Sequence, residues 1–371
     1  MIESGLHDYL FDAIKAGASD LHVTVGLPPM IRVHGKVQPL EYPVLTPNET
    51  REMIYDVLSN EQRQRLENDW ELDIAYTLPR TARFRVNVYF QRGSLGAAFR
   101  TIPEKIPSFE ELGLPKAVEQ MAEKPRGLVL VTGPTGSGKS TTLASMVDKI
   151  NEQRHEHVMS VEDPIEFLHN HKNCIVNQRE VNQDTKSFAE ALKHVLRQDP
   201  DVILVGEMRD LETISLAITA AETGHLVFAT LHTQDAPQTV DRVIDVFPSH
   251  QQSQVRAQLA IALQGIVTQT LVPKRDGKGR VVACEILVPT PGIRNLIREG
   301  KNHQIYSAMQ TGGKFGMQTM DAALVELVRK GEISHEEAEK RSSNVDELKR
   351  LMGGDGTAAR SGKSGYAAIR R

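Results

Sequence analysis

The stretch GLVLVTGPTGSGKST at residues 127–141 decides the fold, because an apolar strand runs directly into a glycine-rich loop. Its second half follows the GxxxxGK[ST] pattern of a phosphate-binding loop, in which glycines let backbone N–H groups turn toward phosphate oxygens. In such a loop Lys139 supplies a positive charge to the β- and γ-phosphates, and Ser140 supplies a hydroxyl for Mg²⁺. The predicted nucleotide-binding residues are Gly133, Pro134, Thr135, Gly136, Ser137, Gly138, Lys139, Ser140 and Thr141.

The flanking residues favour this interpretation over a chance glycine-rich turn. Leu143, Met146, Val147 and Ile150 follow at helical spacing, so a strand, a loop and a helix come in the order that the motif requires. The helix would begin at the loop, where its N-terminal dipole favours bound phosphate. We therefore expect a site for a nucleoside triphosphate and Mg²⁺.

Composition bounds the class of protein. A chain of 371 residues exceeds the length at which a single core stops growing, so two domains are expected. The formal net charge of −4 gives no general attraction to nucleic acid or anionic lipid. Cys174 and Cys284 match no metal-binding spacing and are expected to be structural thiols in a reducing compartment. Because no run approaches about 18 apolar residues and the N-terminal segment is amphipathic, we expect a cytoplasmic protein that is neither exported nor membrane-spanning.

Residues 1–101 predict a small α/β domain. The pattern places strands at 21–25, 30–34 and 83–90, and a charged helix at 50–68. Alternation in the last strand predicts a polar face that presents Arg83 and Arg85, together with Asn87 and Tyr89. The opposite, core face comprises Phe84, Val86, Val88 and Phe90. Prolines in the segment 102–114 indicate an interdomain linker.

Residues 115–352 predict a second α/β domain built on a parallel sheet. Strands at 127–132, 157–161, 202–205 and 226–231 alternate with helices at 139–152, 187–197 and 211–222. After about residue 237 the pattern becomes mainly helical, with a hairpin around 275–280 that leads into a strand at 281–287. Residues 353–371 lack apolar periodicity and predict a disordered tail. Its surplus of Arg and Lys leaves contact with a membrane or partner as the alternative to a solvated tail.

Two acidic segments follow predicted strands of the second domain. Glu207 ends the run DVILVGE, which has the strand-then-acid form of a Walker B segment, and we predict that it acts on the Mg²⁺ side of the site. Glu162 opens EDPIE after the strand 157–161, and is the predicted group that activates the attacking water. The carboxyl ends of parallel strands meet at one edge, where ligands bind in open α/β sheets. For Asp163 and Glu166 the alternative is a helix N-terminal turn.

Two histidines bracket the predicted strand 226–231. His225 precedes it, and His232 follows it at the end where the acids are expected. A lone histidine is more often structural, but His232 is placed to sense the γ-phosphate.

The segments GPTGSGKST, SVEDPIE, ILVGEMRD and TGHLVFATLHT together resemble the secretion ATPase superfamily, the hexameric motors of type II secretion and type IV pili. They match its Walker A, Asp box, Walker B and His box in order. GASDLHVTVGLPPMIRVHG at 17–35 is similar to the start of the family's PAS-like N-terminal domain. GIRNLIRE at 292–299 differs only at its first residue from the AIRNLIRE motif of pilus-retraction members. The resemblance spans about residues 5–340, and implies a PAS-like domain followed by a RecA-like P-loop ATPase domain with helices at its C-terminal end.

The resemblance also implies roles for individual residues. Glu162 corresponds to the family's catalytic glutamate, Glu207 to its Walker B glutamate, and the pair His225 and His232 to its His box. Arginines of the N-terminal domain reach nucleotide at domain and subunit interfaces in this family. Arg83, Arg85 and Arg100 lie in the matching stretches, with a surface-only role as the alternative for each.

The activity implied is ATP hydrolysis that powers type IV pilus retraction and twitching motility. The implied assembly is a homohexamer on the cytoplasmic face of the inner membrane, with the pilus platform protein and a paralogous retraction ATPase as partners. Gly292, in place of alanine, is expected at the N-cap of the motif's helix.

Several alternatives to a pilus retraction motor were considered. An accessory retraction paralogue shares the core motifs and is the closest alternative. Assembly or type II secretion ATPases usually carry a further N-terminal domain and a four-cysteine zinc element, whereas this sequence resembles the PAS-like domain from its start and has two cysteines, so an assembly motor is not expected. A GTPase would need a guanine-reading NKxD element, and the sequence contains none. A nucleic-acid translocase would need an aromatic and basic strand that stacks bases, and no such strand is found, so no nucleic acid partner is expected. A non-catalytic nucleotide-binding scaffold would differ by its lack of turnover.

Overall fold

The computed structural model describes residues 5–33, 35–78, 81–102 and 105–353. It divides into two compact units, one formed by residues 1–106 with 163–169 and the other by residues 107–162 with 170–371. Each unit has its own hydrophobic core. The change of unit falls inside the predicted linker, of which residues 103–104 lie outside the described residues. The predicted disordered tail lies outside them as well, apart from Gly353.

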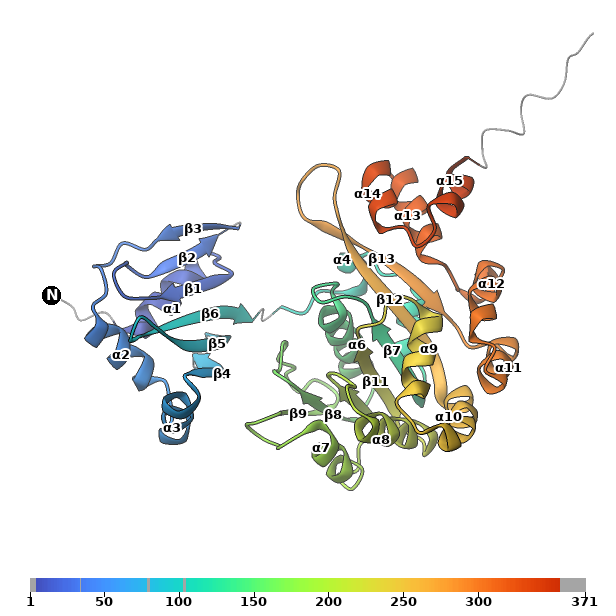
Figure 1. The fold of residues 1–371 in the computed structure, drawn as a ribbon, viewed down its shortest axis with the longest axis horizontal. Coiled ribbons are helices and arrows are strands. Elements are labelled where there is room, and N and C mark those ends of the chain that lie inside the picture. The colour runs from blue at the N-terminus through green and yellow to red at the C-terminus, as the bar shows by residue number, and fades with distance from the viewer. Residues whose placement is uncertain (1–4, 34, 79–80, 103–104, 354–371) are drawn as a thin grey trace, which may run out of the picture. The chain divides into compact units, whose positions relative to one another are not determined.

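The N-terminal unit is built on an antiparallel sheet with strand order β3-β2-β1-β6-β5-β4 (Figure 1). Its strands are β1 Asp20–Val23, β2 Met30–Val33, β3 Lys36–Pro39, β4 Glu71–Leu78, β5 Ala82–Gln91 and β6 Ser94–Ile102. Its helices are α1 Leu6–Lys15, α2 Pro47–Asp56 and α3 Asn60–Asp69. The predicted α/β character is therefore confirmed for this unit.

Two local expectations in this unit were wrong. Phe84, Val86 and Val88 are buried as predicted, but Phe90 is 39% exposed near the end of β5. The single helix expected over 50–68 is two helices, because Ser59 caps α3 by accepting the backbone N–H of Gln62. This capping box begins α3, after α2 has already ended at Asp56.

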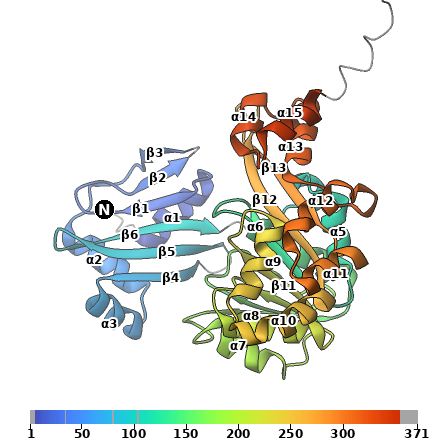
Figure 2. The same ribbon diagram turned by 45° about the vertical axis from the view of Figure 1, so that its right-hand side comes forward.

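The larger unit carries a mostly parallel sheet (Figures 1 and 2). Its strand order is β13-β12-β7-β11-β10-β8-β9. Its strands are β7 Gly127–Thr132, β8 His157–Glu162, β9 Ile175–Glu180, β10 Val202–Val205, β11 Leu226–Leu231, β12 Leu263–Pro273 and β13 Arg280–Leu287. Strand β13 runs antiparallel at one edge, and the strands from β12 to β9 are parallel. The predicted strands and hairpin are confirmed.

Helices cover both faces of this sheet, because alternate residues of each strand point to opposite sides. On one face Val129 and Val131 pack with the helix α6 Lys139–Gln153. On the other face Leu128 and Leu130 pack with helices further along the chain. The helices of this unit are α4 Phe109–Leu112, α5 Lys116–Ala122, α6, α7 Phe188–Val195, α8 Leu211–Glu222, α9 Ala236–Asp245, α10 Ser249–Ala262, α11 Pro291–Glu299, α12 Ile305–Gln310, α13 Met320–Arg329, α14 His335–Arg341 and α15 Val345–Gly353.

Two strands of the larger sheet were not predicted. Strand β12 begins at Leu263, directly after α10 ends at Ala262, so no turn residue marks the change. Strand β9 is an edge strand in which exposed residues interrupt the apolar pattern. In the part of the chain that the structure describes, no helix has both the length and the apolar character needed to cross a membrane.

Candidate functional site

The predicted chemistry gathers at the carboxyl ends of four adjacent parallel strands. Strands β7, β11, β10 and β8 are neighbours in that order. The phosphate loop follows β7, His232 follows β11, Glu207 follows β10, and Glu162 is the last residue of β8. All four segments therefore leave the sheet at the same edge, as the sequence predicted.

The phosphate loop depends on glycine at three positions. Gly133, Gly136 and Gly138 have φ values of +132°, +78° and +93°, which other residues rarely adopt. A Cβ on Gly133 would lie 2.3 Å from the backbone oxygen of Gln269, so no larger residue fits there. The ammonium group of the buried Lys139 donates to the carbonyl oxygens of Gly133 at 2.8 Å and Pro134 at 3.1 Å. The lysine charge thus lies within the loop, at the start of α6.

Side chains of strand β12 form hydrogen bonds with the residues on either side of the phosphate loop. Gln269, which is 1% exposed, donates its amide to the hydroxyl of Thr142 at 2.8 Å in the first turn of α6. The hydroxyls of Thr132 and Thr268 are 2.8 Å apart and join the end of β7 to β12. These contacts hold both ends of the loop against one strand. Sequence reasoning missed them because β12 itself was not predicted.

Glu207 lies within an ionic cluster at the end of β10. Its carboxylate contacts the guanidinium of Arg209 at 2.7 Å and Nε2 of His232 at 3.3 Å. Burial tends to raise the pKa of Glu207, but Arg209 and His232 outweigh it and hold that pKa below its ordinary value. The carboxylate is therefore charged at neutral pH. Arg209, two residues after Glu207, was not among the predicted site residues.

The backbone between β10 and β11 is fixed by Thr230. Its hydroxyl donates to the carbonyl oxygen of Gly206, and its own carbonyl accepts the backbone N–H of Met208 at 3.1 Å. These bonds hold Glu207 beside His232. They account for the contact between two predicted residues that are distant in sequence.

Glu162 is held by two side-chain donors. Its Oε1 accepts the hydroxyl of Ser160 at 2.6 Å and the amide of Gln178 at 3.1 Å. Gly206 allows the end of β10 to lie close by, since a Cβ there would be 3.2 Å from Cα of Glu162. Neither Ser160 nor Gln178 was predicted as a site residue. The i, i+2 spacing of Ser160 and Glu162 on one strand was the available signal for the first of them.

His225 is not brought together with these residues. It lies just before β11, at the amino ends of the strands, where its Nδ1 is 2.9 Å from the carbonyl oxygen of Ala220. Its own carbonyl accepts the backbone N–H of Gly127 at 2.9 Å. The length of β11 therefore separates the two histidines, and the structure gives His225 no place beside the phosphate loop.

The predicted arginines belong to the N-terminal unit. Arg83 and Arg85 lie on β5, and Arg100 lies on β6 directly opposite Arg85. Arg85 and Arg100 are exposed, and Nε of Arg100 contacts the carboxylate of Asp20 at 2.9 Å. Burial raises the pKa of Asp20, but its bonds with Ser19 and Arg100 lower it by more. A direct role of any of the three at nucleotide stays a prediction.

The helix of the retraction motif, α11, begins differently from the expectation. Thr290 is the N-cap and accepts the backbone N–H of Ile293, whereas Gly292 lies within the first turn. The expectation that Gly292 caps the helix was therefore wrong. Ile293 and Ile297 are buried, and Leu296 is partly buried. The guanidinium of Arg294 donates to the carbonyl oxygens of Ala260 and Ile261, and so anchors the end of α10.

Comparison with known proteins agrees with the predicted family. The model of the type II/IV secretion system protein family matches residues 1–340. The chain is 56% identical over 328 residues to the type IV pilus retraction ATPase PilT of Pseudomonas aeruginosa, covering 88% of this chain and 95% of that protein. It is 44% identical over 339 residues to the type IV pilus ATPase PilU of the same organism, covering 91% of this chain and 88% of that one.

A solved structure extends the likeness to the fold. The crystal structure of the pilus retraction motor PilT with bound ADP superposes with a TM-score of 0.89 at 51% identity, covering 94% of this chain and 100% of that one. The predicted architecture, a small N-terminal α/β domain followed by a RecA-like P-loop domain with C-terminal helices, is confirmed. With its phosphate loop and acidic strand ends on one sheet edge, the chain is a P-loop ATPase that belongs to the type II/IV secretion system protein family.

Proposed function

We propose that this protein is the ATP-hydrolysing motor of type IV pilus retraction. The observation that carries the proposal is the convergence of Lys139, Glu207, His232 and Glu162 on adjacent strand ends. A loop for the phosphates, an ionised acid and a second acid beside it are the groups that phosphoryl transfer to water requires. The likeness to PilT along nearly the whole chain supports retraction as the work performed.

The residues present fit Mg²⁺ as the metal. Mg²⁺ prefers oxygen ligands and usually takes only one or two from the protein in addition to substrate phosphates. The hydroxyl of Ser140 and the carboxylate of Glu207 are such ligands, and the lowered pKa of Glu207 keeps it charged. When bound, Mg²⁺ would neutralise charge on the phosphate oxygens.

The reaction assigns one task to each of these side chains. Lys139 and the backbone N–H groups of the loop bind the β- and γ-phosphates. The carboxylate of Glu162 takes a proton as the water oxygen bonds to the γ-phosphorus. The bond from that phosphorus to the β–γ bridging oxygen breaks, and ADP and phosphate leave. His232, through its contact with Glu207, links occupancy of the γ-position to the end of β11.

A ring explains how hydrolysis becomes directed work. Sequential changes around a closed ring of six copies would turn a central partner, which one isolated site does not do. The partner proposed is the platform protein of the pilus machine, at the inner face of the cytoplasmic membrane. Arg83, Arg85 and Arg100 are proposed to reach nucleotide in this assembly.

Deletion of the gene tests the direction of the motor. Cells without a retraction motor should be hyperpiliated and should not twitch, whereas bald cells would indicate pilus assembly instead. Reintroduced wild-type protein should restore twitching, and Glu162→Gln should not.

An accessory retraction role is the second candidate, since the chain also aligns along most of its length with PilU. The protein expressed as the sole retraction ATPase separates the two roles. Twitching in such cells supports the main motor, and its absence supports the accessory role.

A further inference from the structure

We propose that Ser160 and Gln178 are positioning residues that hold the carboxylate of Glu162 in the orientation and the charge state needed to activate water. This inference rests on the proposed function. It begins with the two bonds that converge on Oε1 of Glu162, from the Ser160 hydroxyl at 2.6 Å and the Gln178 amide at 3.1 Å.

The pairing of β8 with β9 explains why these three side chains meet. In the parallel register Ser160 lies opposite Gln178, and Glu162 lies opposite Glu180. Residues two apart on a strand share a face, and so do residues that are opposite each other on adjacent strands. Ser160 and Gln178 therefore lie one step before Glu162 on its own face. From there both reach forward to the same oxygen.

This face is the one that α6 covers. Val158 and Val176, which precede Ser160 and Gln178 by two residues, pack in the same cluster as Leu143 and Met146 of α6. The Glu162 carboxylate therefore extends from the side of the sheet on which the helix of the phosphate loop lies. Ser160 is 2% exposed, so its side chain is shielded from solvent.

Two donors on one oxygen have two chemical effects. They fix the direction of the carboxylate, and hydrogen bonds from N–H and O–H groups favour its charged form. Glu180, which is 3% exposed, lies opposite Glu162 on β9 and shares this face. Glu207, with its partners Arg209 and His232, follows the other neighbouring strand, β10. Negative charges close together favour protonation, so donors to Glu162 oppose this tendency.

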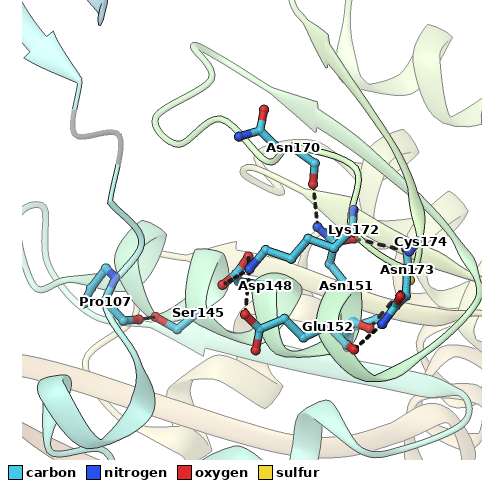
Figure 3. Close-up of polar contacts among 10 residues, drawn as sticks. Pro107, Ser145, Asp148, Asn151, Glu152, Asn170, Lys172, Asn173 and Cys174 are labelled. Atoms are coloured by element: carbon cyan, nitrogen blue, oxygen red, sulfur yellow. Dashed lines mark hydrogen bonds and ion pairs between the residues drawn. The ribbon is translucent and has the colours of Figure 1, made fainter.

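Strand β9 is anchored where an edge strand would otherwise be weakly held. The carboxamide oxygen of Asn151, near the end of α6, accepts the backbone N–H groups of Lys172 at 3.0 Å and Cys174 at 3.3 Å (Figure 3). Its amide donates to the carbonyl oxygen of Asn170 at 2.7 Å. The ammonium of Lys172 bridges Asp148 at 2.8 Å and Glu152 at 2.7 Å on the same helix. One helix thus carries Lys139 at its start and fixes the entry to the strand that carries Gln178.

Steady-state phosphate release by the full-length protein, measured across pH, tests the proposal. Ser160→Ala and Gln178→Leu should each lower kcat about tenfold, the size expected for a hydrogen bond to a charged group. Each should also move the acidic limb of the pH–rate profile to higher pH, because protonation of Glu162 becomes easier. Gln178→Glu, of equal size but negative, should move that limb further. ATP affinity should stay that of the wild type.

Controls separate positioning from general damage. Ser160→Thr keeps the hydroxyl and should retain kcat. Asn177→Leu changes the neighbouring amide of β9, which contacts His157 instead, and should leave the pH profile unchanged. If kcat and the acidic limb of Ser160→Ala and Gln178→Leu match those of the wild type, while Glu162→Gln is inactive, the positioning role is wrong and the proposed function stands. If the wild type itself releases no phosphate, the proposed function fails first.

Discussion

The amino ends of the parallel strands form one side of the large sheet, the amino edge, and their carboxyl ends form the opposite side, the carboxyl edge. Both carry acids and histidines, but these side chains make different contacts. At the amino edge, the ionisable side chains of Asp201 and His225 bond to backbone groups: the carboxylate of Asp201 accepts the N–H of His157 at 2.9 Å, and His225 contacts the carbonyl oxygen of Ala220. The side chain of His157 there contacts the neutral amide of Asn177 on β9. At the carboxyl edge, side chains from different strands contact one another, as Glu207 does with His232. Residue type alone therefore does not mark a site. The direction of the strands does, since it brings together the ends that follow β7, β11, β10 and β8.

The largest effect should come from the lysine of the phosphate loop. Lys139→Ala removes the charge that lies in the loop, and should lower ATP turnover by about 10³-fold or more. Lys149→Ala changes another lysine of α6, which pairs with Glu119 and Glu123 away from the loop, and should keep its turnover. Phosphate release and binding of a fluorescent ATP analogue measure both. Equal losses of turnover in the two variants would mean that both substitutions disturb the folding of α6, and would contradict a specific role for the lysine of the phosphate loop.

Strand β10 offers an acid at each edge for direct comparison. Glu207→Ala should lower turnover about 10²–10³-fold, because the predicted Mg²⁺ ligand and the partner of His232 are lost. Asp201→Ala should leave turnover intact and lower the free energy of unfolding by about 1 kcal/mol, the usual value of one hydrogen bond. Turnover and urea unfolding of both variants provide the test. A catalytic defect in Asp201→Ala would contradict the separation of the edges.

The buried carboxyl group of Glu285 should make the free energy of unfolding depend on pH. Glu285 on β13 lies opposite Thr268 and accepts the backbone N–H groups of Ala236 and Met320, at the starts of α9 and α13. Burial raises the pKa of Glu285 from 4.5 to about 7, more than these two bonds lower it. The folded protein therefore keeps a proton that the unfolded chain releases. The contribution of Glu285 to stability is full below pH 4.5 and is lost as pH rises through about 7.

Glu285→Gln removes this dependence. Its free energy of unfolding relative to the wild type should increase by about 3 kcal/mol between acidic and neutral pH, from 1.36 kcal/mol per pKa unit. Urea unfolding at several pH values measures the difference. Glu326→Gln, on the exposed side of α13, should show no such trend. A flat difference for Glu285→Gln would mean that the carboxyl group ionises normally.

Substitution of the two histidines should give the smallest change in turnover. It compares one histidine at each end of β11. His232→Ala removes the contact with Glu207 and should lower turnover about tenfold. His225→Ala removes a contact with Ala220 at the amino edge and should change turnover little. Steady-state kinetics on both variants decide between an edge-specific role and a joint role of the His box. Equal losses would support the joint role that the family resemblance implied.

The sequence was most informative where the residues of a segment are sufficient to define its structure. The bounds of β7, β10 and β11 were predicted because each is a continuous apolar run that ends in polar or glycine residues. The positions of Lys139, Glu162, Glu207 and His232 followed, since parallel strands place their carboxyl ends together. The fold class and the placement of these four residues at one edge of the sheet were therefore accessible without a structure.

The rest depended on contacts between distant segments. Gln178 and Gln269 act through strands β9 and β12, whose patterns were too polar or too poorly bounded to be predicted. Arg209 was not among the predicted site residues, and its exposed guanidinium is linked to the site by its contact with Glu207. His225 was grouped with His232 because the family resemblance pairs them, although the sequence already placed them at opposite ends of the strand 226–231, as the structure does.

The most direct test of the account is single-turnover hydrolysis of ATP by Glu162→Gln, with ATP affinity measured on the same preparation. The substitution keeps the size of the side chain and removes its capacity to take a proton. Hydrolysis should slow by about 10²–10⁴-fold while ATP affinity stays that of the wild type. Hydrolysis at the wild-type rate would contradict the assignment of Glu162 as the group that activates water, and with it the central role given to this edge of the sheet.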